Sequence, residues 1–162
     1  MRHGEDLALY ETRVAAEWVD YNGHMNDAAY AVVFSHAVDA LMDRIGLHAA
    51  ARKSSGQTLY TLQMMLHYFR ESLEGAPLSV ACRLLEHDVK RMRVWLEMRE
   101  GVGGPLLAAS EQLLMSVAKT DSVVAAPWRA ETMAALDALA HAQSGMPTPK
   151  RAGQGVRLML EA

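Results

Sequence analysis

Hydrophobic and polar residues alternate along five stretches of the chain, and this alternation predicts β-strands. The stretches are 12–19, 58–70, 78–88, 91–100 and 106–117. The third and fourth alternate most cleanly, whereas 106–117 is apolar on both faces apart from a few polar positions. Residues 58–70 carry an apolar series at every second position, namely Tyr60, Leu62, Met64, Leu66 and Tyr68. The links between the last four stretches are short enough for antiparallel hairpins.

Between the first two stretches the polar residues become rare, and the pattern changes to that of a helix. From 28 to 45 the strongly polar residues are Ser35, His36, Asp39, Asp43 and Arg44, and the first four form one narrow stripe through spacings of three or four. Such a helix is buried on most sides. Asn26 is suited to cap its start, and Gly46 to end it. A loop is predicted at 49–57, a second helix at 127–141 and an extended arm at 144–162.

The order of elements is strand, buried helix, then four strands. It predicts an α+β fold in which an antiparallel five-stranded sheet wraps around a central buried helix, with a C-terminal helix added. One domain spans 1–162, with its core at about 10–118 and the C-terminal helix and tail at 127–162. The sheet keeps a second face and free edges, which indicates a partner subunit.

Composition excludes several classes of protein. The chain has 162 residues, of which 51% are hydrophobic, and its 16 basic and 19 acidic side chains give a net charge of -3. A dedicated nucleic-acid binder normally carries a basic excess. The most apolar stretch, 28–45, contains Asp39, Asp43 and Arg44, which argues against a membrane span. Residues 1–10 lack the apolar run of a secretory signal, so the expected compartment is the cytoplasm.

The common catalytic motifs are missing from the sequence. The glycines at 101–104 join two strands and do not open a helix, so they lack the context of a phosphate-binding loop. The seven histidines do not have metal-ligand spacing, and the single cysteine, Cys82, falls within a predicted strand and is expected to be buried. We therefore expect no metal and no bound cofactor.

The remaining candidate for chemistry is the turn before the buried helix, where Asp20 precedes Asn22-Gly23-His24. Free amides at a helix start can bind a polarised carbonyl oxygen. A carboxylate beside that carbonyl can act as a base or as a nucleophile. An Asp at this position also commonly stabilises a turn through its own side chain. The local pattern alone leaves both roles open.

The stretch 17–30, and Asp20, Gly23, His24, Asn26 and Tyr30 within it, resembles the Asp-x-x-Gly-His-x-Asn-x-x-x-Tyr signature of hotdog-fold acyl-CoA thioesterases. These enzymes form the 4-hydroxybenzoyl-CoA thioesterase-like group, and the resemblance extends over 12–117. A narrower similarity covers 18–20, 27–30, 39–47 and 109–114, which look like betainyl-CoA thioesterases of bacterial carnitine breakdown.

The resemblance implies a hotdog fold and places the catalytic carboxylate at Asp20, with oxyanion-binding amides near Asn26 and Asp27. Gly23 would allow close approach of the backbone to the thioester, and His24 would orient the thioester or have a structural role. The aromatic candidates to host a quaternary ammonium group are Trp18, Tyr21, Tyr68 and Trp95. Tyr21 is favoured because it follows Asp20 directly.

The expected substrate is therefore a short acyl-CoA, with betainyl-CoA favoured, and the expected assembly is a homodimer or homotetramer. The phosphates of CoA would be held by Arg70, Lys90 and Arg91, together with Arg93, unless these form only a solvated basic edge. Glu111 would position water or form a structural salt bridge. A thioesterase for another short-chain or aromatic acyl-CoA and a non-catalytic acyl-CoA-binding hotdog protein remain the alternatives.

Overall fold

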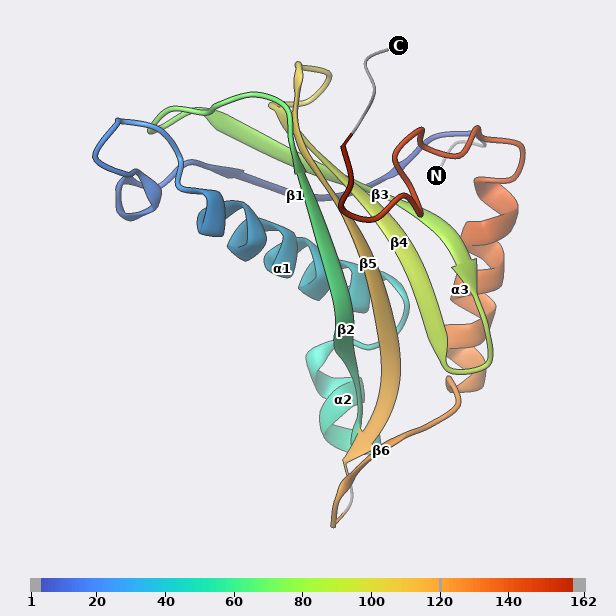
Figure 1. Cartoon of the computed structure of the whole chain (residues 1–162). Coiled ribbons are helices and arrows are strands. Elements are labelled where there is room, and N and C mark those ends of the chain that lie inside the picture. Colours follow the sequence, from blue (N-terminus) through green and yellow to red (C-terminus); the bar gives the residue numbers. More distant parts are fainter. Residues whose placement is uncertain (1–3, 120, 159–162) are drawn as a thin grey trace.

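A computed structural model describes residues 4–119 and 121–158 of the chain (Figure 1). An antiparallel sheet has the strand order β1-β3-β4-β5-β2, and the short β6 pairs with the end of β5. The strands are β1 (Leu7–Arg13), β2 (Gln57–Tyr68), β3 (Pro77–His87), β4 (Arg91–Glu100), β5 (Leu106–Lys119) and β6 (Val123–Ala125). The predicted α+β class and antiparallel sheet are confirmed. The sheet has six strands rather than five, because residues 123–125 turn back along β5.

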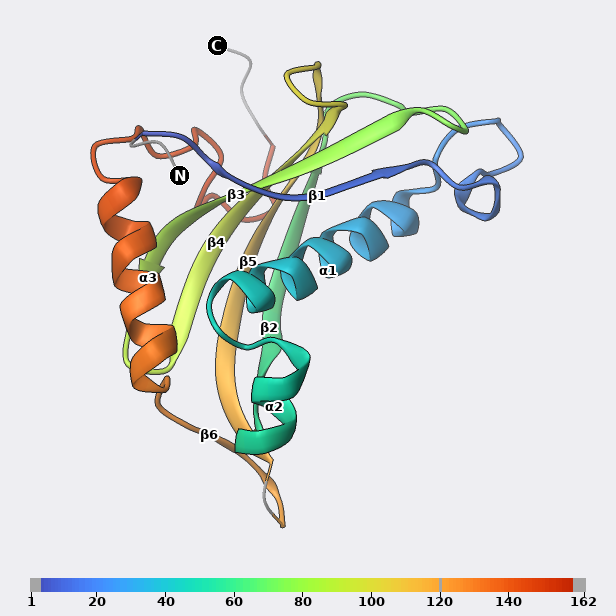
Figure 2. The same ribbon diagram turned by 180° about the vertical axis from the view of Figure 1, so that it is seen from behind.

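The central helix α1 (Asp27–Arg44) lies across one face of the sheet, here called the inner face (Figure 2). Its apolar side is buried, and Phe34 and Leu41 are fully enclosed against the strands. The polar stripe at Ser35, His36, Asp39 and Asp43 faces outward. Asn26 caps the helix by accepting a hydrogen bond from the N–H of Ala28, as the sequence predicted.

The first strand lies earlier in the chain than predicted. β1 runs from Leu7 to Arg13, and Ala16–Trp18 form a 3-10 turn instead of continuing the strand. The limit is set by the partner strand: β3 begins at Pro77, which pairs with Arg13, so no β3 residue remains to pair further along. Alternation identifies extended chain, but only the partner determines where pairing stops.

The edge strand β2 contains a bulge that divides its apolar series between the two faces. Thr61 pairs with Leu114, but Gln63 already pairs with Leu113. Residues that are directly opposite in an antiparallel pair share a face. Tyr60, opposite Met115, therefore lies on the outer face, while Met64, opposite the buried Gln112, lies on the inner face. The prediction of one continuous apolar face from Tyr60 to Tyr68 was wrong for this reason.

Two helices complete the fold. The stretch predicted as a loop contains α2 (Ala49–Ser55), which is capped by His48 and ended by Gly56 at φ 67°. The last helix, α3 (Ala130–Ala142), starts later than the predicted 127. The side chain of Gln143, just after it, accepts from the N–H of Leu84 and donates to the carbonyl of Cys82. These bonds cover the part of the β3 edge that β1 does not reach.

Cys82 is fully buried, as predicted, and burial raises the pKa of its thiol. A buried thiol of raised pKa is a packing group and not a nucleophile at neutral pH.

Candidate functional site

The Asp20 turn is closed by its own backbone and side chain. The N–H of Asp20 donates to the carbonyl of His24 over 2.9 Å, and Oδ1 of Asp20 accepts from the N–H of Asn22 over 2.8 Å. Gly23 has φ 80°, a value that favours glycine. Oδ2 of Asp20 has no hydrogen-bond partner among the described residues. The carboxylate therefore stabilises the turn with one oxygen and keeps the other open for chemistry.

The start of α1 lies directly against this turn, because Val19 pairs with Met25 in a short antiparallel bridge. The N–H of Asn26 donates to the carbonyl of Trp18 over 2.8 Å. It is therefore not free to bind a substrate oxygen, contrary to the role that the resemblance implied for it. The N–H of Asp27, the first residue of α1, has no partner within the described part of the chain. Asp27 is thus the better candidate for an oxyanion-binding amide.

A hollow of about 310 Å³ opens beside Asp27 and is lined by Met25, Asp27, Tyr30, Tyr68, Phe69, Arg70 and Glu71. The hydroxyl of Tyr68, at the end of β2, donates to the carbonyl of Asp27 over 3.1 Å. The hydroxyl of Tyr30 donates to the carbonyl of Arg70 over 3.3 Å. The two tyrosine rings meet edge to face, with centroids 5.3 Å apart. Strand and helix thus build one wall of the hollow together.

Both phenols of this wall are neutral at neutral pH. Burial raises the pKa of Tyr30, and the neighbouring Tyr68 and Glu71 raise it further. Burial also raises the pKa of Tyr68, with a second contribution from Asp27. Sequence reasoning gave no role in the site to Glu71. It named Tyr30 only as part of the signature, because the spacing along α1 does not show that β2 ends beside it.

The other residues predicted around the turn are spread over different environments. Nε2 of His24 lies 3.1 Å from Oε2 of Glu71, so this imidazole faces the loop after β2. Trp18 packs partly against the core. Tyr21 is 97% exposed at the tip of the turn and does not line the hollow, so the ring favoured from sequence points into solvent in this chain.

The basic residues predicted for CoA do not form one cluster. Arg70 follows the end of β2 and lines the hollow beside Asp27. Lys90 and Arg91 lie in the β3–β4 hairpin, at the other end of the sheet (Figure 1). On β5, Tyr68 pairs with Ala108 and Arg91 pairs with Met115. These two β5 residues are about 23 Å apart along the strand, at ~3.3 Å per residue. One compact phosphate site therefore cannot include all three.

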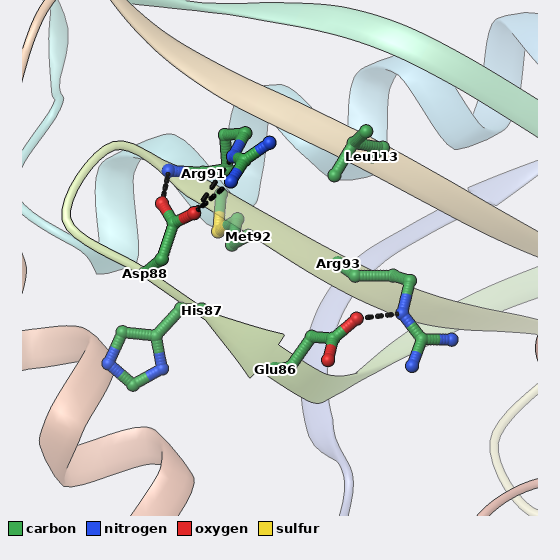
Figure 3. A pocket seen from close by; sticks show the side chains of 7 residues that line it. All are labelled: Glu86, His87, Asp88, Arg91, Met92, Arg93 and Leu113. Atoms are coloured by element: carbon green, nitrogen blue, oxygen red, sulfur yellow. Dashed lines mark hydrogen bonds and ion pairs between the residues drawn. The ribbon is translucent and has the colours of Figure 1, made fainter.

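The hairpin has its own hollow of about 300 Å³ (Figure 3). It is lined by Glu86, His87, Asp88, Arg91, Met92, Arg93 and Leu113. Its positive charges already have partners. Arg91 binds Asp88 over 2.6 Å, and Arg93 binds Glu86 over the same distance. The N–H of Lys90 and the Arg91 guanidinium lower the pKa of Asp88 to about 2. This hollow is a structural ion-pair network at a hairpin and lies away from the Asp20 turn.

Glu111 and Trp95 lie on the outer face of the sheet, opposite α1. Glu111 forms an ion pair of 2.6 Å with Arg93 and accepts a bond from the N–H of Gly153 in the C-terminal arm. The Arg151 guanidinium lies 4.9 Å from the ring centroid of Phe69. Figure 1 shows the arm crossing in front of β4 and β5. Glu111 therefore has the structural role, and the arm is held by it.

Within residues 4–119 and 121–158, no group of three His, Cys, Asp or Glu side chains is placed to hold a metal ion. No helix in the same part of the chain is long and apolar enough to cross a membrane.

Comparison with known proteins places this geometry in a family. Residues 14–136 match the model of the Thioesterase-like superfamily. The chain belongs to this superfamily. A betainyl-CoA thioesterase of Pseudomonas aeruginosa is 43% identical over 152 residues, which cover 94% of this chain and 95% of that protein. An L-carnitine dehydrogenase/betainyl-CoA thioesterase of Agrobacterium fabrum is 38% identical, over 93% of this chain but 30% of its own length.

Solved structures show the same fold. A Pseudomonas putida KT2440 protein assigned as a thioesterase has a TM-score of 0.79 and 35% identity, over 96% of this chain and 99% of its own. A Staphylococcus aureus protein solved in complex with CoA has a TM-score of 0.82 and 23% identity, over 99% of this chain and 98% of its own. The hotdog fold that the resemblance implied is confirmed.

Proposed function

We propose that this chain hydrolyses an acyl-CoA thioester, and that its substrate is betainyl-CoA, which yields glycine betaine and free CoA. The observation that carries the proposal is that the turn holding the Asp20 carboxylate, with its Oδ2 open, leads directly into the start of α1, where the unpartnered Asp27 amide adjoins an open hollow. The 43% identity to a betainyl-CoA thioesterase over nearly the whole chain supports the choice of acyl group.

In this proposal the thioester carbonyl oxygen accepts a hydrogen bond from the N–H of Asp27. That bond strengthens as the oxygen becomes negative, and one such donor lowers the activation barrier by about 3 kcal/mol. Asp20 either takes a proton from the attacking water or attacks the carbonyl carbon itself, in which case water then cleaves the mixed anhydride. In both routes the C–S bond breaks, and the CoA sulfur leaves as a thiolate that takes up a proton.

Gly23 and His24 belong to the turn that leads from Asp20 to this amide, and in this proposal they face the bound thioester. Trp18 and Tyr21, which the sequence also offered for substrate contact, do not line the hollow. Arg70 is suited to meet the phosphates of CoA, because it is exposed and forms no ion pair with the described residues. Lys90 and Arg91 fit that role less well. The β5 partner of Arg91 lies about 23 Å along that strand from the partner of Tyr68, the residue two before Arg70. Arg91 is also already paired with Asp88.

We also propose that two copies of the chain associate through β2, forming a homodimer or, by further association, a homotetramer. β2 is an edge strand of the described sheet, and its middle residues Tyr60, Leu62 and Met64 are 40%, 46% and 39% exposed. An exposed apolar edge is a template for pairing with another strand. We propose that each copy is one domain and works in the cytoplasm.

A thiol-release assay over a panel of acyl-CoAs that includes betainyl-CoA tests this function. Release of CoA from betainyl-CoA above the other substrates supports the proposal as stated. Preference for another acyl-CoA supports the first alternative, a thioesterase of different specificity. Binding of acyl-CoA without release of thiol would support the second, a non-catalytic binding protein.

A further inference from the structure

The hollow beside Asp27 combines two tyrosine rings with two carboxylates. Tyr30 and Tyr68 form one wall, while Asp27 and Glu71 lie at its rim. We propose that Tyr68, supported by Tyr30, is the specificity-determining residue that receives the trimethylammonium group of the substrate. This inference rests on the proposed function and assigns the part of the site that selects the acyl group.

Position favours Tyr68 over every other ring in the site. In a betainyl thioester the quaternary nitrogen lies two bonds from the carbonyl carbon, so its host must adjoin the group that binds the carbonyl oxygen. Asp27 satisfies both requirements at once. Its N–H is open, and its carbonyl accepts the hydrogen bond from the hydroxyl of Tyr68. The hydroxyl end of Tyr68 is therefore fixed on the residue whose N–H is open, at the start of α1.

The chemistry of the ligand matches these rings. A trimethylammonium group has no hydrogen-bond donor, so it is bound by aromatic faces and by nearby negative charge. Asp27 and Glu71 supply the charge, and the same negative field contributes to the raised pKa of both tyrosines. Arg70 is the basic residue among those lining this hollow. Its carbonyl binds Tyr30, while its side chain is exposed.

The other aromatic candidates lie elsewhere. Tyr21 is 97% exposed outside the hollow, and Trp18 packs against the core. Trp95 is buried on the outer face, with its ring 5.5 Å from that of His67. Since none of the three lines the hollow, Tyr68 and Tyr30 are the tyrosines that can meet a short acyl group there.

The test compares betainyl-CoA with 3,3-dimethylbutyryl-CoA, its uncharged isostere, in which carbon replaces the quaternary nitrogen. The measured quantity is the ratio of kcat/KM for the two substrates. We expect Tyr68→Leu to lower this ratio about tenfold, on the scale of a single cation–π contact. Tyr68→Phe, which keeps the ring and removes the hydroxyl, should retain most of the ratio. Tyr10→Leu is the control: it removes a tyrosine ring on β1, at the opposite edge of the sheet, that does not line the hollow, and it should leave the ratio unchanged.

A second variant tests the contribution of negative charge separately from that of the Tyr68 ring. Glu71→Gln should lower the ratio by about two- to threefold, because one of the two carboxylates at the rim loses its charge.

Equal losses of kcat/KM on both substrates in Tyr68→Leu would overturn the inference, since the ring would then only pack. A wild-type enzyme that prefers the isostere would also overturn it, while leaving the thioesterase function intact. If wild-type protein released no thiol from any acyl-CoA, the proposed function would fail. Calorimetric binding of betainyl-CoA against the isostere would then decide the subsite on its own.

Discussion

The hydroxyl of Tyr68 donates to the main-chain carbonyl of Asp27 over 3.1 Å and so joins the last residue of β2 to the first residue of α1. The bond links two elements that are 41 positions apart in sequence. It fixes Tyr68, part of the aromatic wall of the hollow, against the helix start that carries the free N–H of Asp27. The candidate site is therefore a property of the junction between the edge strand and the central helix.

Replacing Asp20 by Asn should keep the fold and remove most of the activity. Asn retains an oxygen that can accept the bond from the N–H of Asn22, so the turn survives. We expect less than about a tenth of the wild-type rate, a loss of more than about 1.4 kcal/mol of barrier stabilisation. Thiol release and thermal melting measure the two effects. Asp39→Asn, an exposed carboxylate on α1, is the control that should leave both unchanged. A fully active Asp20→Asn protein would contradict the mechanism.

Light scattering at micromolar concentration should return at least twice the 17.8 kDa mass of one chain. Leu62→Lys places a charge at the bulge of the exposed β2 edge and should shift the mass towards a single chain. Val102→Lys gives the matched control, because Val102 is 80% exposed in the β4–β5 loop and distant from that edge. Wild-type protein of one chain mass would refute the proposed assembly.

The ion pair between Arg93 and Glu111 should matter more for stability than the pair between Arg91 and Asp88. The first pair is mostly shielded, with side chains 29% and 14% exposed, while the second is 51% and 39% exposed. Arg93→Met should cost about 1–3 kcal/mol of unfolding free energy, because Glu111 is left partly buried without its cation. Arg91→Met should cost less than about 1 kcal/mol. Urea denaturation measures the unfolding free energy of both variants. Equal losses of unfolding free energy would show that shielding from solvent does not set the strength of these ion pairs.

His67 should make the fold less stable as the solution becomes acidic. Burial lowers the pKa of His67, and the nearby Arg151 lowers it further, against a smaller opposite effect of Glu111. Its Nε2 is buried without a hydrogen-bond partner among the described residues.

Because the folded-state pKa lies below the unfolded value of about 6.5, the unfolded chain binds more protons once the pH falls below that value. Stability is therefore retained at higher pH and lost as the pH falls through about 6.5. Urea midpoints at about pH 7.5 and about pH 5.5 measure the slope. His67→Leu, which cannot titrate, should reduce the slope, and an unchanged slope would exclude His67 as its source.

Much of the fold follows from the sequence because each element is specified by a local pattern. The near absence of polar residues from 28 to 45 predicted α1 to within one residue of its end at Arg44, and alternation predicted β4 at Arg91–Glu100. The Asp20 turn and the Asn26 cap were likewise predictable. Each depends on side chains reaching backbone groups only two residues away.

The sequence alone did not determine how the strands pair with one another. The bulge at Leu62 moves Tyr60 to the outer face, and the start of β3 at Pro77 ends the pairing of β1. The occupied N–H of Asn26 follows from the way the chain folds back at the Val19–Met25 bridge, which brings the carbonyl of Trp18 to it. By itself, the sequence determined α1, β4 and the Asp20 turn that we propose to be catalytic, since these arise from interactions between near neighbours. The tertiary structure alone decided which amide is free and which rings surround it, since these depend on where strands and helix meet in space.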